Sequence, residues 1–99
     1  MGSPRKVAFS RAAADAIRAA HPDLRRKIRA VVDTLSDRPD VGKALVDELD
    51  GCWSARVGRH RIVYRWSRAG LEVVLVGPRA TIYEESARLL RRDSGRGRP

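Results

Sequence analysis

The sequence has few of the residues that form disulfide bonds or bind metal ions. Cys52 is the single cysteine among 99 residues, which excludes a disulfide framework and a cysteine-based zinc site. The two histidines, His21 and His60, lie far apart in the sequence and offer little to a histidine-ligated metal site. We therefore expect a protein without a metal ion or other cofactor, and the low cysteine content favours a cytoplasmic location.

Long apolar runs are also missing. No stretch approaches the roughly 18 apolar residues that a membrane-spanning helix needs. Residues 1–7 lack the apolar core of a signal peptide. The sequence contains no glycine-rich phosphate loop and no Gly-x-Ser-x-Gly nucleophile motif. These absences predict a protein that does not associate with membranes and that lacks the familiar signatures of nucleotide-binding and serine-hydrolase enzymes.

Positive charge, in contrast, is abundant and almost entirely arginine. The chain has 21 Lys and Arg against 12 Asp and Glu, a formal net charge of +9. Three of these cations are lysines and 18 are arginines, whose guanidinium groups bind phosphate or carboxylate in a bidentate manner. A GC-rich genome would account for the arginine bias but not for the net charge. The charge balance therefore predicts a polyanionic partner.

Apolar periodicity predicts one domain over residues 1–93, followed by a basic, mobile tail over residues 94–99. Ser10 is placed to cap a first helix, and Pro22 lies in the first turn of a second helix. From residue 52 the apolar period changes to two, which predicts antiparallel strands joined by hairpins. The expected fold is α+β: a small, mostly antiparallel β-sheet with an N-terminal helical hairpin on one face and a short C-terminal helix. The expected elements are strands 6–9, 52–57, 60–66 and 71–76, and helices 11–20, 22–35 and from 81 onwards.

The alternation of residues along the first predicted hairpin places several basic side chains on one face. If Gly58 and Arg59 form a two-residue turn, Arg56 lies directly opposite Arg61. Two arginines in that position repel each other, and a bound anion would relieve the repulsion. Alternatively, both side chains simply extend into solvent. The face with Arg56 and Arg61 also carries Ser54 and Arg65, and the opposite, core face carries Trp53, Ala55, Val57, Ile62, Tyr64 and Trp66.

A further arginine and a tyrosine follow the last predicted strand. Arg79 comes just after that strand and just before the helix that starts near Thr81. The N-terminus of a helix favours an anion, because its backbone N–H groups are free and its dipole is positive there. Tyr83 falls in the first turn of the same helix and is either part of this site or an aromatic at the edge of the core. A phosphodiester is the anion that we expect at such a site.

The residues of these segments resemble a known family. Residues 53–64, 76–79 and 82–84 are similar to the RelE/ParE superfamily of bacterial toxins, and to its RelE branch especially. Residues 43–51 are similar to the segment that precedes the first hairpin strand in that family, so the resemblance covers roughly residues 5–90. It implies a RelE-like fold and the toxin of a type II toxin–antitoxin system. The implied activity is ribosome-dependent cleavage of messenger RNA by attack of the RNA 2′-hydroxyl, without a metal ion.

The resemblance also implies roles for individual residues. Arg61, Arg79 and Tyr83 correspond to catalytic positions, with Tyr83 as the candidate base. Substrate binding is assigned to Arg56, Ser54 and Arg65, and His60 is the alternative acid or base. Three positions depart from the family pattern. Ser54 replaces an active-site lysine, His60 stands where an aromatic residue is more common, and Pro78 stands where lysine or histidine is frequent.

The implied partners are an acidic, partly disordered antitoxin, the ribosome and messenger RNA, and operator DNA contacted through the antitoxin. Two other functions remain open. One is a ParE-like toxin that inhibits DNA gyrase by binding, and the other is a nucleic-acid-binding member of the same fold with weak catalytic activity. Ser54 stands where the family has an active-site lysine, and this departure favours the weakly active alternative.

Overall fold

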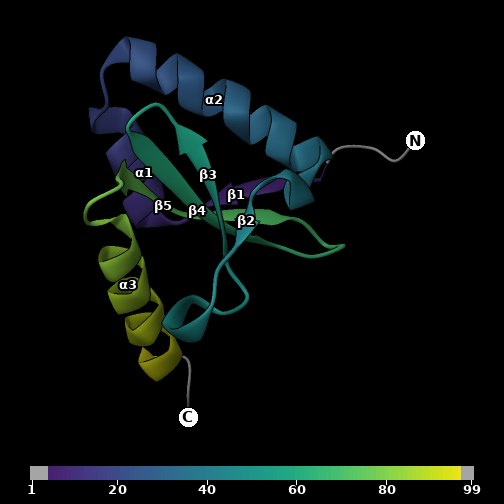
Figure 1. Ribbon diagram of the computed structural model, residues 1–99, viewed down its shortest axis with the longest axis vertical. Helices are drawn as coiled ribbons and strands as arrows, with labels where there is room; N and C mark the ends of the chain where they lie inside the picture. The colour runs from purple at the N-terminus through teal and green to yellow at the C-terminus, as the bar shows by residue number, and fades with distance from the viewer. Residues whose placement is uncertain (1–4, 97–99) are drawn as a thin grey trace.

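A computed structural model describes residues 5–96, and its central feature is a five-stranded sheet in the order β1-β5-β4-β3-β2 (Figure 1). β1 pairs parallel to β5, and all the other neighbouring strands pair antiparallel. The α+β class and the mostly antiparallel sheet predicted from the sequence are confirmed. The elements are β1 (Val7–Phe9), α1 (Arg11–Ala19), α2 (Pro22–Asp37), the 3-10 helix η1 (Pro39–Val41), β2 (Lys43–Ala44), the 3-10 helix η2 (Asp47–Leu49), β3 (Trp53–Val57), β4 (His60–Trp66), β5 (Leu71–Pro78) and α3 (Ile82–Arg96).

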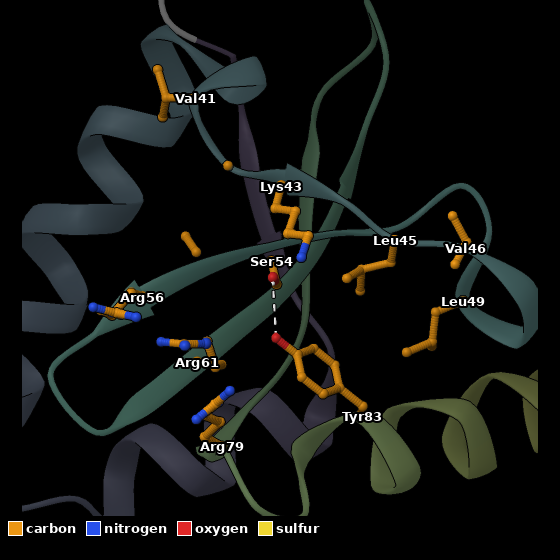
Figure 2. A pocket seen from close by; sticks show the side chains of 12 residues that line it. Val41, Lys43, Leu45, Val46, Leu49, Ser54, Arg56, Arg61, Arg79 and Tyr83 are labelled. Carbon is orange, nitrogen blue, oxygen red and sulfur yellow. Dashed lines mark hydrogen bonds between the residues drawn. The ribbon is translucent and has the colours of Figure 1, made fainter.

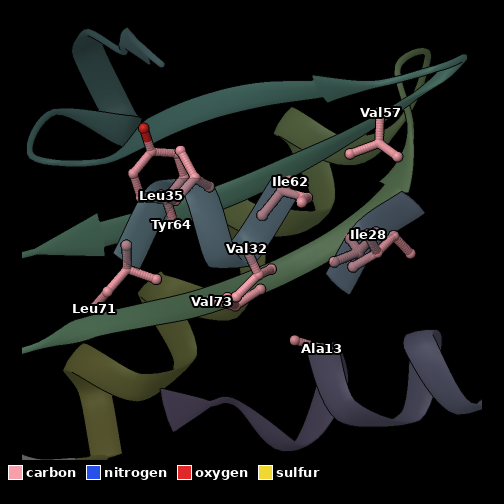
Figure 3. Packing of buried hydrophobic residues seen from close by; sticks show 10 residues of the cluster. Ala13, Ile28, Val32, Leu35, Val57, Ile62, Tyr64, Leu71 and Val73 are labelled. Carbon is pink, nitrogen blue, oxygen red and sulfur yellow. The ribbon is translucent and has the colours of Figure 1, made fainter. Parts of the chain in front are cut away.

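The N-terminal helical hairpin forms as predicted and covers one face of the sheet. The Ser10 hydroxyl caps α1 by accepting a hydrogen bond from the Ala13 N–H at 2.9 Å. His21 caps α2, and Pro22 occupies the first helical turn. Side chains of both helices pack on β3, β4 and β5 to form the larger hydrophobic core (Figure 3), made of Ala13, Ile28, Val32, Leu35, Val57, Ile62, Tyr64, Leu71, Val73 and Val76.

Helix α3 lies on the opposite face of the sheet, where it builds a second core. Val63 of β4 alternates with Ile62 and Tyr64, so it points away from α1 and α2 and toward α3. Ile82 and Ala87 of α3 pack there, so the sheet is covered on both faces. This second core consists of Leu49, Cys52, Val63, Val74, Leu75, Ile82 and Ala87.

Helix α3 extends to Arg96, so residues 94–96, which the sequence analysis assigns to a basic, mobile tail, are helical. Arg91 and Arg92 favour the helix, and one glycine at position 95 weakens a helix without ending it. Residues 97–99 of the predicted tail lie outside the described residues. No helix within residues 5–96 is long and apolar enough to cross a membrane.

Candidate functional site

A pocket of about 630 Å³ opens on the α3 side of the sheet, between β2, the β3–β4 hairpin and the start of α3 (Figure 2). Its lining residues differ in character from one side to the other. Arginines lie along the end near the β3–β4 turn, and aliphatic side chains line the end near η2. Tyr83 and Ser54 lie between these two ends.

The hairpin places Arg56 and Arg61 as the sequence predicted. Val57 pairs with His60 across a turn in which Gly58 has φ 59°, a conformation that glycine adopts without strain. Arg56 is therefore the direct partner of Arg61, and both side chains line the pocket. Because neighbouring cations repel, this pair favours a bound anion.

Arg79 approaches the same pocket from the end of β5. Its backbone N–H donates to the Arg59 carbonyl at 3.3 Å, which ties the segment before α3 to the hairpin turn. Thr81 then precedes α3, and its carbonyl accepts the helical hydrogen bond from the Glu85 N–H at 3.0 Å. Gly77 permits α3 to start this close to the sheet, because a Cβ atom there would lie 3.3 Å from Cδ1 of Ile82. Arg79 therefore lies beside a helix N-terminus and faces Arg61 (Figure 2).

Tyr83 combines the two roles that the sequence left open. Its ring is half-buried against the α3-side core, as an aromatic at the core edge would be. Its hydroxyl points into the pocket and donates a hydrogen bond to Oγ of Ser54 at 3.3 Å (Figure 2). Ser54 is 6% exposed and lies on β3, so its hydroxyl is a fixed partner for the tyrosine.

Two other predicted site residues lie outside this pocket. Arg65 shares a strand face with Arg61 but is four residues further along β4, about 13 Å at the usual strand rise. There it is the partner of Glu72 on β5, and its Nε lies 2.5 Å from the Glu72 carboxylate. His60 is half-buried at the hairpin tip between Val57 and Pro78, on the other face of β4.

The sequence analysis missed one side of the pocket completely. Lys43 lies on β2, and Leu45, Val46 and Leu49 form an aliphatic wall that continues into η2. Val46 is 70% exposed, Leu45 is half-buried and Leu49 is buried, so the wall reaches solvent mainly at Val46. A strand of two residues gives no periodic signal, and the family resemblance of residues 43–51 identified the segment without assigning any of its residues to the site.

The pocket has a strong positive character. Four of its lining residues are cations, Lys43, Arg56, Arg61 and Arg79, and none is acidic. Among the side chains of residues 5–92, no ion pair involves any of these four. Unpaired cations grouped around a hydroxyl suit a phosphodiester, whose charge they can neutralise and whose transition state they can stabilise.

The buried cysteine takes no part in this site. Cys52 belongs to the α3-side core, and burial raises the pKa of its thiol. A raised pKa leaves little thiolate at neutral pH, so the residue is a poor nucleophile. In the part of the chain whose side chains are described, residues 5–92, no group of three or more His, Cys, Asp or Glu side chains is arranged to hold a metal ion.

Comparisons with known proteins agree with the fold. Residues 7–83 match the family model described as the ParE toxin of type II toxin–antitoxin system, parDE. A comparison with curated proteins gives no match. Among solved structures, the toxin–antitoxin complex RelBE2 from Mycobacterium tuberculosis contains a chain that is 34% identical, with a TM-score of 0.63. The match covers 78% of this chain and 93% of that chain.

More distant structures share the fold. A mutant of the E. coli toxin RelE in the free state is 16% identical with a TM-score of 0.69, over 86% of this chain and 95% of that chain. The YoeB–YefM toxin–antitoxin complex from Staphylococcus aureus contains a chain 17% identical with a TM-score of 0.64, over 74% of this chain and 94% of that one. Because the family model matches most of the sequence and the mycobacterial chain is 34% identical, the protein belongs to the RelE/ParE superfamily of type II toxin–antitoxin toxins.

Proposed function

We propose that this protein is a ribosome-dependent messenger-RNA endonuclease that an antitoxin keeps inactive. The observation that supports the proposal best is that Arg56, Arg61, Arg79 and Tyr83 line one pocket that has no acidic residue in its lining. A toxin that acts only by binding another protein has no need for this combination of phosphate-binding cations and a group that can exchange a proton.

Cleavage of RNA by its own 2′-hydroxyl requires three chemical events at the site. The RNA 2′-hydroxyl must lose a proton, the charge on the attacked phosphate must be stabilised, and the 5′-oxygen must leave. Tyr83 takes the proton of the 2′-hydroxyl, with Ser54 holding the tyrosine hydroxyl at the pocket. Arg61 and Arg79 stabilise the phosphate charge, and Arg56 holds the neighbouring backbone.

The site also explains the proposed need for a ribosome. The pocket contains no histidine and no carboxylate, so it lacks the usual strong acid–base pair of a free-standing ribonuclease. Positioning of the substrate is then the main remaining source of rate, because in-line geometry alone contributes several orders of magnitude. A ribosome that holds the message in this geometry would supply it, and such a target places the protein in the cytoplasm.

An antitoxin partner is part of the same proposal. The 34%-identical mycobacterial chain was solved as a toxin–antitoxin complex, and so was the Staphylococcus aureus YoeB relative. We propose that the partner here is acidic and partly disordered, because the pocket carries four cations and no compensating carboxylate. Contact with operator DNA would then run through the antitoxin.

The test is a purified translation system with one defined message. We expect new message ends, mapped by primer extension, that appear only when ribosomes are present. The same message incubated with the protein and without ribosomes is the control and should remain intact. Unbroken message on stalled or translating ribosomes would overturn the proposed activity.

Inhibition of DNA gyrase is the second candidate, and one observation favours it: the matching family model is that of the ParE toxin. A gyrase supercoiling assay separates the two. Loss of supercoiling at stoichiometric protein, together with intact message in the translation assay, would identify the protein as a gyrase inhibitor.

A further inference from the structure

Lys43 is a basic residue of the pocket to which neither the sequence pattern nor the family resemblance gives a role. It lies on β2, directly opposite Ser54 of β3 in the antiparallel register. Directly opposite residues project from the same face of a sheet, so Lys43 and Ser54 point to the same side. Figure 2 shows the Lys43 side chain extending along the pocket toward Ser54, with the Tyr83 hydroxyl on the far side of that serine.

The chain before Lys43 is held closely against the sheet. The buried Tyr64 hydroxyl donates a 2.6 Å hydrogen bond to the carbonyl of Pro39 in η1. Gly42 passes so near to β3 that a Cβ atom there would lie 2.7 Å from the Ser54 carbonyl oxygen and would also overlap the Tyr64 hydroxyl. After β2, the Leu45 N–H donates to the Cys52 carbonyl at 2.9 Å. The backbone of Lys43 is therefore fixed on both sides, as a residue that must meet a substrate requires.

The charge of Lys43 is available for a ligand. No carboxylate of residues 5–92, whose side chains the structure describes, lies within ion-pair distance of its ammonium group, and no acidic residue lines its pocket. Arg65 illustrates the alternative arrangement, because a strand neighbour, Glu72, neutralises it. The ammonium of Lys43 thus adds a fourth cation beside Arg56, Arg61 and Arg79.

The ammonium group of Lys43 can donate a proton to a substrate, which the arginines of the pocket cannot do. A guanidinium binds phosphate well but does not give up its proton in proteins, whereas an ammonium can transfer one. If Tyr83 takes the proton of the 2′-hydroxyl, the departing 5′-oxygen still needs a proton from another group. Among the residues that line the pocket, Lys43 is the cation that can provide it.

We propose that Lys43 is a further catalytic residue, which contacts the scissile phosphate and protonates the leaving 5′-oxygen; this inference rests on the proposed function. The Tyr83 oxygen, whose own proton has first passed to solvent, takes the proton of the 2′-hydroxyl, and the 2′-oxygen forms a bond to phosphorus. The bond between phosphorus and the 5′-oxygen breaks, and that oxygen takes a proton from the Lys43 ammonium. The products are a 2′,3′-cyclic phosphate and a 5′-hydroxyl, and the proton released to solvent returns to the Lys43 amine, which restores both residues.

The first experiment measures single-turnover cleavage of ribosome-bound message by three variants. Lys43→Ala should cleave about 100- to 1000-fold more slowly than the parent, the usual effect of losing a proton donor. Lys43→Arg keeps the charge and should bind a 2′-O-methyl RNA oligonucleotide like the parent, yet cleave at least about ten-fold more slowly. Lys27→Ala removes an exposed lysine of α2, outside the pocket, and should cleave at the parental rate.

The second experiment asks whether the lost step is protonation of the leaving group. A message with sulfur in place of the bridging 5′-oxygen at the cleavage site has a leaving group that needs no proton. On this substrate Lys43→Arg should cleave within about two- to three-fold of the parent, which a merely structural defect would not produce. A full deficit on the sulfur substrate would overturn the assignment.

The outcomes separate this inference from the proposed function. A parent protein that makes no ribosome-dependent cuts overturns the nuclease proposal, and the role of Lys43 with it. If the parent cuts the message and both Lys43→Ala and Lys43→Arg cut it at the parental rate, the nuclease proposal stands. Only the role of Lys43 is then overturned.

Discussion

Arg61 and Arg79 differ from several other arginines of this protein in what lies beside them. Arg65, Arg88 and Arg91 each have a carboxylate partner, Glu72, Glu84 and Glu48 respectively. Arg61 and Arg79 face the open pocket and one another. Their charges therefore contribute little to the folded state itself and are available to stabilise a charge that develops on a substrate.

We expect Arg61→Ala and Arg79→Ala each to slow cleavage of ribosome-bound message by about two to three orders of magnitude. This corresponds to a loss of about 2.7–4 kcal/mol of transition-state stabilisation, as for one preorganised oxyanion donor. Thermal unfolding should be nearly unchanged, because neither residue belongs to a core cluster.

Arg65→Ala is the matched control for these two variants. It removes an arginine from the same strand face as Arg61, but one that is paired with Glu72 and lies outside the pocket. We expect cleavage close to the parental rate. Equal losses in all three variants would point to a general electrostatic effect rather than to a local site.

Tyr83→Phe and Ser54→Ala test the hydroxyl pair. Tyr83→Phe keeps the ring that packs on the α3-side core and removes only the hydroxyl, so we expect a stable protein whose cleavage rate falls by about 100-fold or more. Ser54→Ala removes only the partner that positions this hydroxyl and should have a smaller effect. Single-turnover rates on ribosome-bound message provide the comparison, and parental cleavage by Tyr83→Phe would exclude Tyr83 as the base.

At the level of elements, the segment from η1 to β2 connects the core on one face of the sheet to the pocket on the other. Tyr64 is fully buried in the core beneath α1 and α2, and its hydroxyl reaches the Pro39 carbonyl at 2.6 Å. Removing this hydroxyl leaves the carbonyl without its donor, at a cost of about 1–3 kcal/mol. The same change loosens the segment from η1 to β2, which positions Lys43 at the pocket.

We therefore expect Tyr64→Phe to lower the free energy of unfolding by about 1–3 kcal/mol and to reduce cleavage as well. The effect on stability should depend on pH. Burial raises the pKa of the Tyr64 hydroxyl from its ordinary value of 10.0 to about 12, so the folded state favours the protonated form. This contribution to stability is fully present below about pH 10 and is lost as the pH rises through about 12.

Denaturant unfolding at a series of alkaline pH values measures this prediction. Between about pH 10 and 12 the stability of the parent should fall more steeply than that of Tyr64→Phe, which has no hydroxyl to ionise. Other groups titrate in both proteins, so the difference between the two curves isolates Tyr64. Parallel curves would contradict the prediction.

The elements also show which parts of the fold a sequence can reveal. Gly58 and Arg59 specify a two-residue turn, and strict alternation on both sides then fixes the pairing of Arg56 with Arg61. β2 was not predicted because two residues carry no periodicity, and its position depends on the contact of Gly42 with Tyr64 and Ser54. That contact joins residues far apart in the sequence, so neither Lys43 nor the aliphatic wall could be assigned to the site beforehand.

For the whole molecule, the division of the sheet into two faces separates stability from function. The face beneath α1 and α2 is closed by apolar side chains, and the face with α3 is closed at one end and open over the cationic pocket at the other. With a net charge of +9, the protein should attract a polyanion over a long range.

Binding to single-stranded RNA should accordingly weaken steeply with salt, because each cation–phosphate contact releases a condensed counterion. We expect the slope of log affinity against log salt to fall by about one in Arg61→Ala and in Lys43→Ala, and to stay unchanged in Lys27→Ala. Affinities measured by fluorescence anisotropy with a 2′-O-methyl oligonucleotide provide the slopes. A flat salt dependence in the parent would contradict the polyanion argument.

The antitoxin should act on the same open face. α3 is anchored by few large apolar side chains, namely Ile82, Tyr83, Leu89 and Leu90, and by the ion pair of Arg91 with Glu48 at 2.7 Å. An acidic segment that folds on binding can therefore either cover the pocket or displace this helix. Covering predicts slower amide hydrogen exchange over β3–β4 and the start of α3, whereas displacement predicts faster exchange along α3. Exchange measured on the toxin alone and in complex with its antitoxin distinguishes the two modes, and unchanged exchange over both regions would show that the antitoxin acts from elsewhere on the molecule.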